Sequence, residues 1–91
     1  MFNEINEPIQ VIAKFVHLRQ GSGGQVGNKT IPVKFLWNGK EILIRKVNLT
    51  YSRREGRSKF YFFAVSDDVN YFKLQFNSEN LQWTLLESYA D

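Results

Sequence analysis

Three observations predict an all-β fold for this chain. Aromatic residues make up 15% of the sequence, and such side chains pack well on the pleated surface of a sheet. Apolar and polar residues alternate in several short segments, and turn-forming residues separate these segments. We therefore expect residues 1–91 to form one domain. Its fold should be a small antiparallel meander of five or six strands, curled into an SH3-like or OB-like barrel or a strongly bent sheet.

Residues 9–18 have two interpretations. Asn6 could cap a helix that has Pro8 in its first turn and ends at Gly21. Against a helix, the segment is rich in β-branched residues, and Ile9 and Val11 alternate with polar neighbours. We expect a strand, with a helix as the alternative.

A flexible glycine-rich loop is expected over residues 20–30, because four glycines in residues 20–29 leave little to pack. Residues 31–37 then alternate, with Val33, Phe35 and Trp37 on one face. Asn38-Gly39 follows at once, and both residues accept the positive φ of a type I′ turn. This pattern predicts a tight β-hairpin.

The return strand changes its pattern part-way. Ile42 and Ile44 share one face, whereas Val47, Leu49 and Tyr51 have the opposite parity, so we predict a β-bulge at Arg45-Lys46. Residues 52–58 read as a second loop. The remaining strands are expected over residues 59–65, 69–76 and 81–89, with turns at 67–68 and 77–80.

Little in the sequence supports catalysis. The chain has no cysteine, so it can form neither a disulfide nor a thiolate zinc site. His17 is the single histidine, and the acidic residues are scattered in turns, where they serve turn geometry. We expect no catalytic residue, no metal site, no cofactor and no enzymatic activity. No apolar run approaches a membrane span, and the acidic N-terminal residues are unlike a signal peptide, so a cytoplasmic protein without a membrane partner is expected.

Charge is unevenly distributed along the chain. Residues 29–59 carry nine Lys or Arg against Glu41 and Glu55, whereas residues 60–91 carry a net negative charge. Basic groups beside aromatic rings are how small β-barrels hold single-stranded nucleic acid. The candidate phosphate contacts are Arg45, Lys46, Arg53, Arg54, Arg57 and Lys59, and the candidate stacking residues are Tyr51 and Tyr61. Alternatively, the aromatic residues belong to the core and the arginines solvate a long hairpin.

Two kinds of partner follow from this reading. The first is nucleic acid, single-stranded or duplex, bound by the basic hairpin. The second is a protein partner or a second copy of the chain, paired through an exposed edge strand at residues 9–18 or 81–89 with no nucleic-acid binding.

The order of landmarks also resembles a family. The landmarks are Glu7-Pro8-Ile9, Val11, Pro32-Val33, Phe35, Trp37, Gly39, Val47, Phe60-Tyr61-Phe62, Val65, Tyr71, Leu74, Trp83, Leu85, Tyr89 and Asp91. Together they resemble a family of short uncharacterised bacterial proteins often associated with Y-family translesion DNA polymerases. The resemblance covers nearly the whole chain except residues 20–29, and the Arg-rich region after Tyr51 departs from it. It implies an all-β domain in a DNA-repair context.

Overall fold

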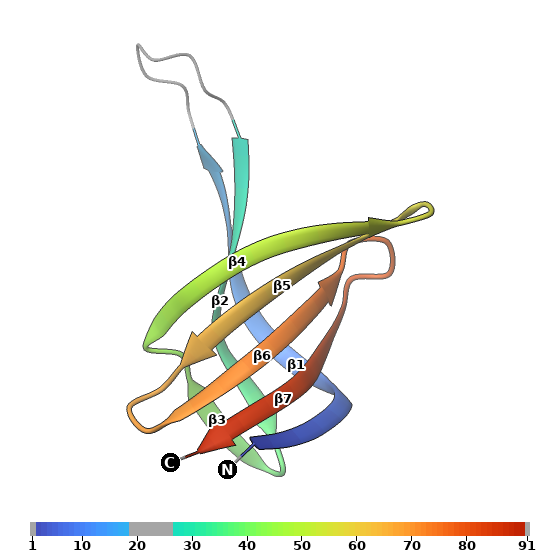
Figure 1. The fold of residues 1–91 in the computed structure, drawn as a ribbon. Coiled ribbons are helices and arrows are strands. Elements are labelled where there is room, and N and C mark those ends of the chain that lie inside the picture. Colours follow the sequence, from blue (N-terminus) through green and yellow to red (C-terminus); the bar gives the residue numbers. More distant parts are fainter. Residues whose placement is uncertain (1, 19–26, 91) are drawn as a thin grey trace.

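The computed structural model describes residues 2–18 and 27–90, which form one antiparallel sheet of seven strands (Figure 1). The strands are β1 (Phe2–Leu18), β2 (Gly27–Trp37), β3 (Lys40–Leu43), β4 (Lys46–Glu55), β5 (Ser58–Ser66), β6 (Asn70–Asn77) and β7 (Gln82–Ala90). Their order in the sheet is β3-β2-β1-β7-β6-β5-β4. The all-β prediction is confirmed, with seven strands rather than five or six. No helix among the described residues is long and apolar enough to cross a membrane.

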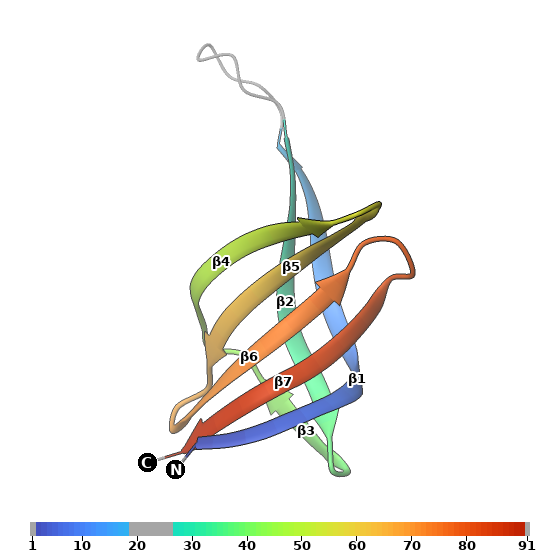
Figure 2. The ribbon, with the colours of Figure 1, turned by 45° about the vertical axis from the view of Figure 1, so that its right-hand side comes forward.

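The long strand β1 belongs to two layers (Figure 2). Its first part pairs with β7 up to Ile9, and its second part pairs with β2 from Gln10 onward. Asn6 has a positive φ of 55° within the register shift between Glu4 and Glu7, a β-bulge that bends the strand. The sheet therefore folds over itself into a five-stranded layer (the start of β1 with β7, β6, β5 and β4) and a three-stranded layer (the rest of β1 with β2 and β3). The segment at residues 9–18 is a strand, as predicted.

The hydrophobic core fills the space between the two layers. Its buried members are Phe35, Phe63, Val65, Phe72, Leu74, Phe76, Trp83 and Leu85. Phe35 of the three-stranded layer meets Phe72 of the five-stranded layer edge to face, with ring centroids 5.2 Å apart. Leu74 and Leu85 are fully buried. Alternate residues of β5, β6 and β7 thus face inward, which leaves the intervening residues on the outer side of the five-stranded layer.

Two hairpin turns are set by residues that tolerate positive φ. Asn38 and Gly39 have φ values of 53° and 73°, which confirms the predicted type I′ turn between β2 and β3. Gly56 has a φ of 59° in the two-residue turn that joins β4 to β5. The prediction of a loop over residues 52–58 was therefore wrong, since the strands continue to this turn. Polar side chains on an exposed hairpin do not prevent its backbone from pairing.

The predicted bulge at Arg45-Lys46 was also wrong, because the chain changes edges there. β3 lies at one edge of the sheet and β4 at the other, and the chain crosses between them at Ile44 and Arg45. The Ile44 amide donates to the Val33 carbonyl at 2.9 Å, and the Arg45 amide donates to the Ser66 carbonyl at 2.8 Å. The first bond continues the β2–β3 pairing and the second continues the β4–β5 pairing, so the chain alone connects the two edges at this corner and the sheet is not closed into a barrel. The β4 register shift lies further on, between Val47 and Leu49.

The structure also bears on the predicted glycine-rich loop and on the predicted edge strands. Of the predicted glycine-rich loop at residues 20–30, residues 27–30 lie in β2, and residues 20–26 fall outside the described part of the chain. The predicted edge strand at residues 81–89 was wrong, since β7 pairs with both β1 and β6. Residues 10–18 of β1 pair with β2 alone among the described residues, so this part of β1 does have an open side. The outermost strands of the sheet order are β3 and β4. Sequence periodicity shows that a segment is a strand, whereas its neighbours are decided by long-range pairing.

Candidate nucleic-acid interface

The outer side of the five-stranded layer, here called the outer face, collects side chains from β4, β5 and β6. Its composition follows from the register of two hairpins. Tyr51 of β4 lies opposite Phe62 of β5, and Lys73 of β6 lies opposite Ala64 of β5. Arg53, two residues beyond Tyr51, shares its side of the strand. The pairing thus gathers residues separated by more than twenty positions in the sequence.

Four of these residues form what we call the aromatic–cation cluster: Tyr51, Arg53, Phe62 and Lys73. The rings of Tyr51 and Phe62 are stacked, with centroids 4.9 Å apart and planes 15° apart. The Arg53 guanidinium carbon lies 5.4 Å from the centroid of Phe62. The Lys73 ammonium lies 5.5 Å from the centroid of Tyr51 and 5.7 Å from that of Phe62. Each cation is within the range of cation–π attraction.

Phe62 is the centre of this cluster. It is only 4% exposed, although it lies on the outer face and is not part of the core between the layers. Tyr51, Arg53 and Lys73 cover it, so the buried ring holds the other three in place. Tyr51 itself is 40% exposed. The arrangement leaves the Tyr51 ring accessible to solvent, with Lys73 of β6 beside it and Arg53 of β4 beside the Phe62 ring beneath.

The residues predicted from sequence are divided between two faces and a turn. Tyr51 and Arg53 lie on the outer face, and Lys46 lies opposite Ser66 at the start of β4. Arg54, Lys59 and Tyr61 lie on the other face, where the Lys59 ammonium is 5.2 Å from the Tyr61 centroid. Tyr61 also packs against the core and the Phe76 ring, so it is not a free stacking surface. Arg57 lies in the turn, and Arg45 lies at the corner.

Sequence reasoning missed Lys73 and the role of Phe62. The alternation of β6 puts Lys73 on the side away from Phe72 and Leu74, so the sequence alone predicts which side of the strand it occupies. What the sequence did not show was that β6 pairs with β5 in a register that brings Lys73 beside Tyr51. Phe62 reads as core because β5 is apolar on both faces. Only its cross-strand partners show that it belongs to the outer face and not to the core between the layers.

A second aromatic group extends the outer face. Tyr71 and Tyr89 are a cross-strand pair with centroids 6.4 Å apart, and Phe2 lies opposite Tyr89. All three are exposed. A groove of about 260 Å³ runs beside them, lined in part by Lys73 and Glu87. Lys73 therefore stands between two aromatic groups.

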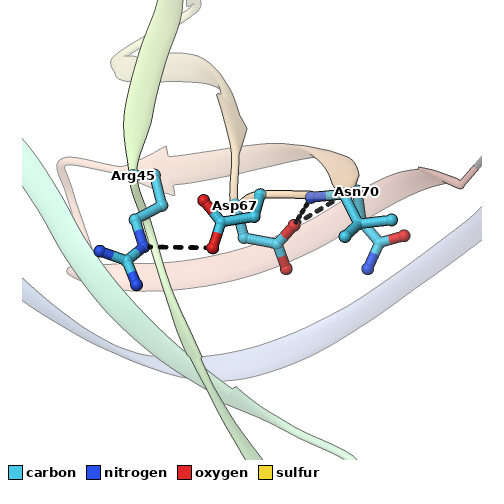
Figure 3. Close-up of polar contacts among 5 residues, drawn as sticks. Arg45, Asp67 and Asn70 are labelled. Atoms are coloured by element: carbon cyan, nitrogen blue, oxygen red, sulfur yellow. Dashed lines mark hydrogen bonds and ion pairs between the residues drawn. The ribbon is translucent and has the colours of Figure 1, made fainter.

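The corner that joins the two edges is stabilised by polar contacts (Figure 3). Nε of Arg45 lies 3.7 Å from a carboxylate oxygen of Asp68, and both side chains are mostly exposed. The Asp67 carboxylate accepts hydrogen bonds from the amides of Val69 at 2.8 Å and Asn70 at 2.6 Å. This geometry is an Asx-type turn between β5 and β6. Arg45 thus has a structural role at the corner, apart from the aromatic–cation cluster.

The Asp67 turn makes stability depend on pH. Partial burial acts to raise the pKa of Asp67, but the hydrogen bonds from Asn70 and Val69 outweigh it and hold the pKa below the ordinary 3.8. The ionised carboxylate therefore stabilises the fold above about that pH, and this contribution is lost as the pH falls through the lowered pKa. We expect Asp67→Asn to be less stable than the natural chain near neutral pH by under about 1 kcal/mol, because the site is partly solvated. Urea unfolding at a series of pH values checks this. A difference that persists unchanged into strong acid would contradict it.

Other parts of the fold offer less chemistry. A cavity of about 440 Å³ lies between the β2–β3 hairpin and strands β6 and β7. Trp37 lines it, and its buried Nε1 has no hydrogen-bond partner among the described residues. Within the described ranges, no group of three or more His, Asp or Glu residues is placed to hold a metal ion. The outer face is the surface where aromatic and cationic groups converge.

Comparison with protein-family models, curated proteins and solved structures gave no match. The resemblance to the polymerase-associated family therefore stays a prediction.

Proposed function

We propose that this domain is a non-enzymatic accessory module that binds single-stranded nucleic acid on its outer face. The observation that supports it most is the aromatic–cation cluster, in which Tyr51 is stacked on Phe62 between Arg53 and Lys73. The cations meet phosphate, and the exposed Tyr51 ring stacks on a base. The family resemblance suggests a DNA-repair context, and the N-terminal sequence suggests the cytoplasm as the location.

Single strands suit this surface better than duplexes. Stacking on a tyrosine needs a base whose face is free, and bases in a duplex are stacked on one another. The second aromatic group, Tyr71 and Tyr89, offers a further stacking position on the far side of Lys73. The OB-like curl expected from the sequence agrees with this use, because OB barrels bind oligonucleotides on an outer strand face.

The charge near the cluster is balanced. Among the described residues, the cations of the outer face are Lys46, Arg53 and Lys73, and Glu4, Glu55 and Glu87 lie on the same face. Arg53 is 2.9 Å from Glu55, and this pair is exposed to water. A phosphate can replace Glu55 at low cost, because exposed ion pairs contribute only about 0–1 kcal/mol. Affinity is therefore expected to depend on salt only as far as about three phosphate contacts allow.

A salt series tests the proposal. Fluorescence anisotropy with labelled oligothymidylate should show binding whose log–log salt slope is about −2, since each phosphate contact to a single strand contributes about −0.7. Arg53→Ala should weaken binding by about fivefold and make the slope shallower by about one contact. Arg54→Ala is the matched control, because this neighbouring arginine lies on the opposite face.

Three results would overturn the proposal. They are no binding at low salt, equal effects of the two arginine substitutions, and tighter binding to duplex than to single strands. Binding only to a protein partner would favour an interaction module instead.

A further inference from the structure

The outer edge of β4 is a second candidate binding surface, separate from the outer face. β4 is the last strand in the sheet order, and all ten of its residues are exposed. Edge strands present unpaired N–H and C=O groups that can pair with another chain. Within the described residues, β4 pairs with β5 alone.

The hairpin register identifies which backbone groups face outward. Glu55 and Ser58 flank the two-residue turn, so they form a hydrogen-bonded pair of the ladder. Hydrogen-bonded pairs alternate with non-bonded ones, and the register is uninterrupted from Leu49 to Glu55. The backbone groups of Thr50, Ser52 and Arg54 therefore point away from β5. They offer three consecutive pairing positions to an incoming strand.

A small open pocket lies at the start of this edge, and its lining includes Thr30, Asn48 and Thr50 as well as apolar residues. It encloses about 230 Å³ between β2 and β4. Ile31 and Pro32 line one side, and Val47 and Leu49 line the other. Pro32 has no N–H, so β2 is a poor template for strand addition at that point. A strand paired with β4 would place an apolar side chain in this pocket.

The charge along the edge selects the partner. Residues 46–57 carry four basic side chains and one acidic side chain, which are Lys46, Arg53, Arg54, Arg57 and Glu55. Two copies of β4 would carry the same excess of cations to each other, which opposes self-pairing. An acidic strand would be attracted by the same groups.

We infer that the β4 edge is a docking site for an extended acidic peptide segment of another protein, which adds to the sheet as an eighth strand. The segment has one apolar side chain for the pocket and acidic residues on one face, beside either Arg53 or Arg54. Backbone pairing at Thr50, Ser52 and Arg54 supplies the register, and the cations supply the preference for acidic sequence. This site depends on backbone groups of the edge, which nucleic-acid binding does not use, although the side chain of Arg53 belongs to both sites.

Amide hydrogen exchange followed by NMR tests the inference without a variant. In the free protein, the amides of Tyr51 and Arg53 should exchange slowly and those of Thr50, Ser52 and Arg54 quickly. A short peptide that alternates valine with glutamate should slow the three fast amides. A peptide that alternates valine with lysine is the control, and it should leave them fast.

A proline substitution tests the same edge by binding. Ser52→Pro removes one outward N–H and no bond to β5, whereas Ser52→Ala keeps that donor. We expect Ser52→Pro to weaken binding of the valine–glutamate peptide by about tenfold and Ser52→Ala to leave it within about twofold. The inference is overturned if both variants bind alike or if the lysine peptide binds as well. It is also overturned if oligothymidylate slows the same three amides, or if the chain dimerises through this edge.

Discussion

Phe63→Ala is expected to lower the free energy of unfolding by about 3–5 kcal/mol. Phe63 is 2% exposed, and its ring lies 5.5 Å from that of Trp83 within the core between the layers. Truncation removes apolar contact and leaves a cavity that the surrounding sheet cannot fill, because both layers are tied by their hydrogen bonds. Domains are stable by about 5–15 kcal/mol in all, so this loss is a large share of the total. Urea unfolding followed by tryptophan fluorescence measures it.

Phe15→Ala is the matched control for this prediction. Phe15 is the same residue type on β1, but its side chain is 70% exposed. We expect a change of no more than about 0.5 kcal/mol, as is usual for surface positions. Equal losses from the two phenylalanine substitutions would mean that the core does not lie where the two layers meet.

Tyr51→Ala is expected to weaken binding of oligothymidylate by about tenfold, with stacking worth about 1–3 kcal/mol per base. Tyr51→Ala also removes the ring that stacks on Phe62, so the melting temperature should fall, by about 4–8 °C for each kcal/mol of lost stacking. Tyr51→Phe keeps the ring and should bind almost as the natural chain does, because stacking does not need the hydroxyl. Anisotropy titrations of the three proteins at one salt concentration make the comparison.

The pair of substitutions separates stacking from charge. If Tyr51→Ala and Tyr51→Phe both bind as tightly as the natural chain, the ring does not stack on a base, and the contact is with phosphate alone. If Tyr51→Phe loses binding as fully as Tyr51→Ala, the hydroxyl is the contact. Either outcome removes Tyr51 from its proposed role, whereas the salt slope reports the cations separately.

Local chemistry explains which structural predictions succeeded. Asn38-Gly39 gave a correct turn type because positive φ is a property of those two residues. The β-branched residues of β1 gave a correct strand because side-chain stiffness acts within the strand. The loop prediction for residues 52–58 failed because it took polarity as evidence against pairing, although an edge strand keeps one side in water.

Arg53 and Arg54 show why local sequence chemistry could not predict the composition of the candidate site. Arg53 and Arg54 are adjacent in the sequence, so they read as one basic group. In a strand, adjacent residues point to opposite faces, and the two arginines have different neighbours as a result. Arg53 joins Phe62 and Lys73, whereas Arg54 lies opposite Lys59.

The sequence by itself determined that this chain is all-β, where its tightest hairpin turns, and that its middle is basic. Those properties depend on single residues or on alternation along one segment. Only the tertiary structure decided that β4 is an edge, that Phe62 lies outside the core, and that Lys73 stands beside Tyr51. These follow from which strands pair and in what register, and that choice is made by burying the residues of both layers together.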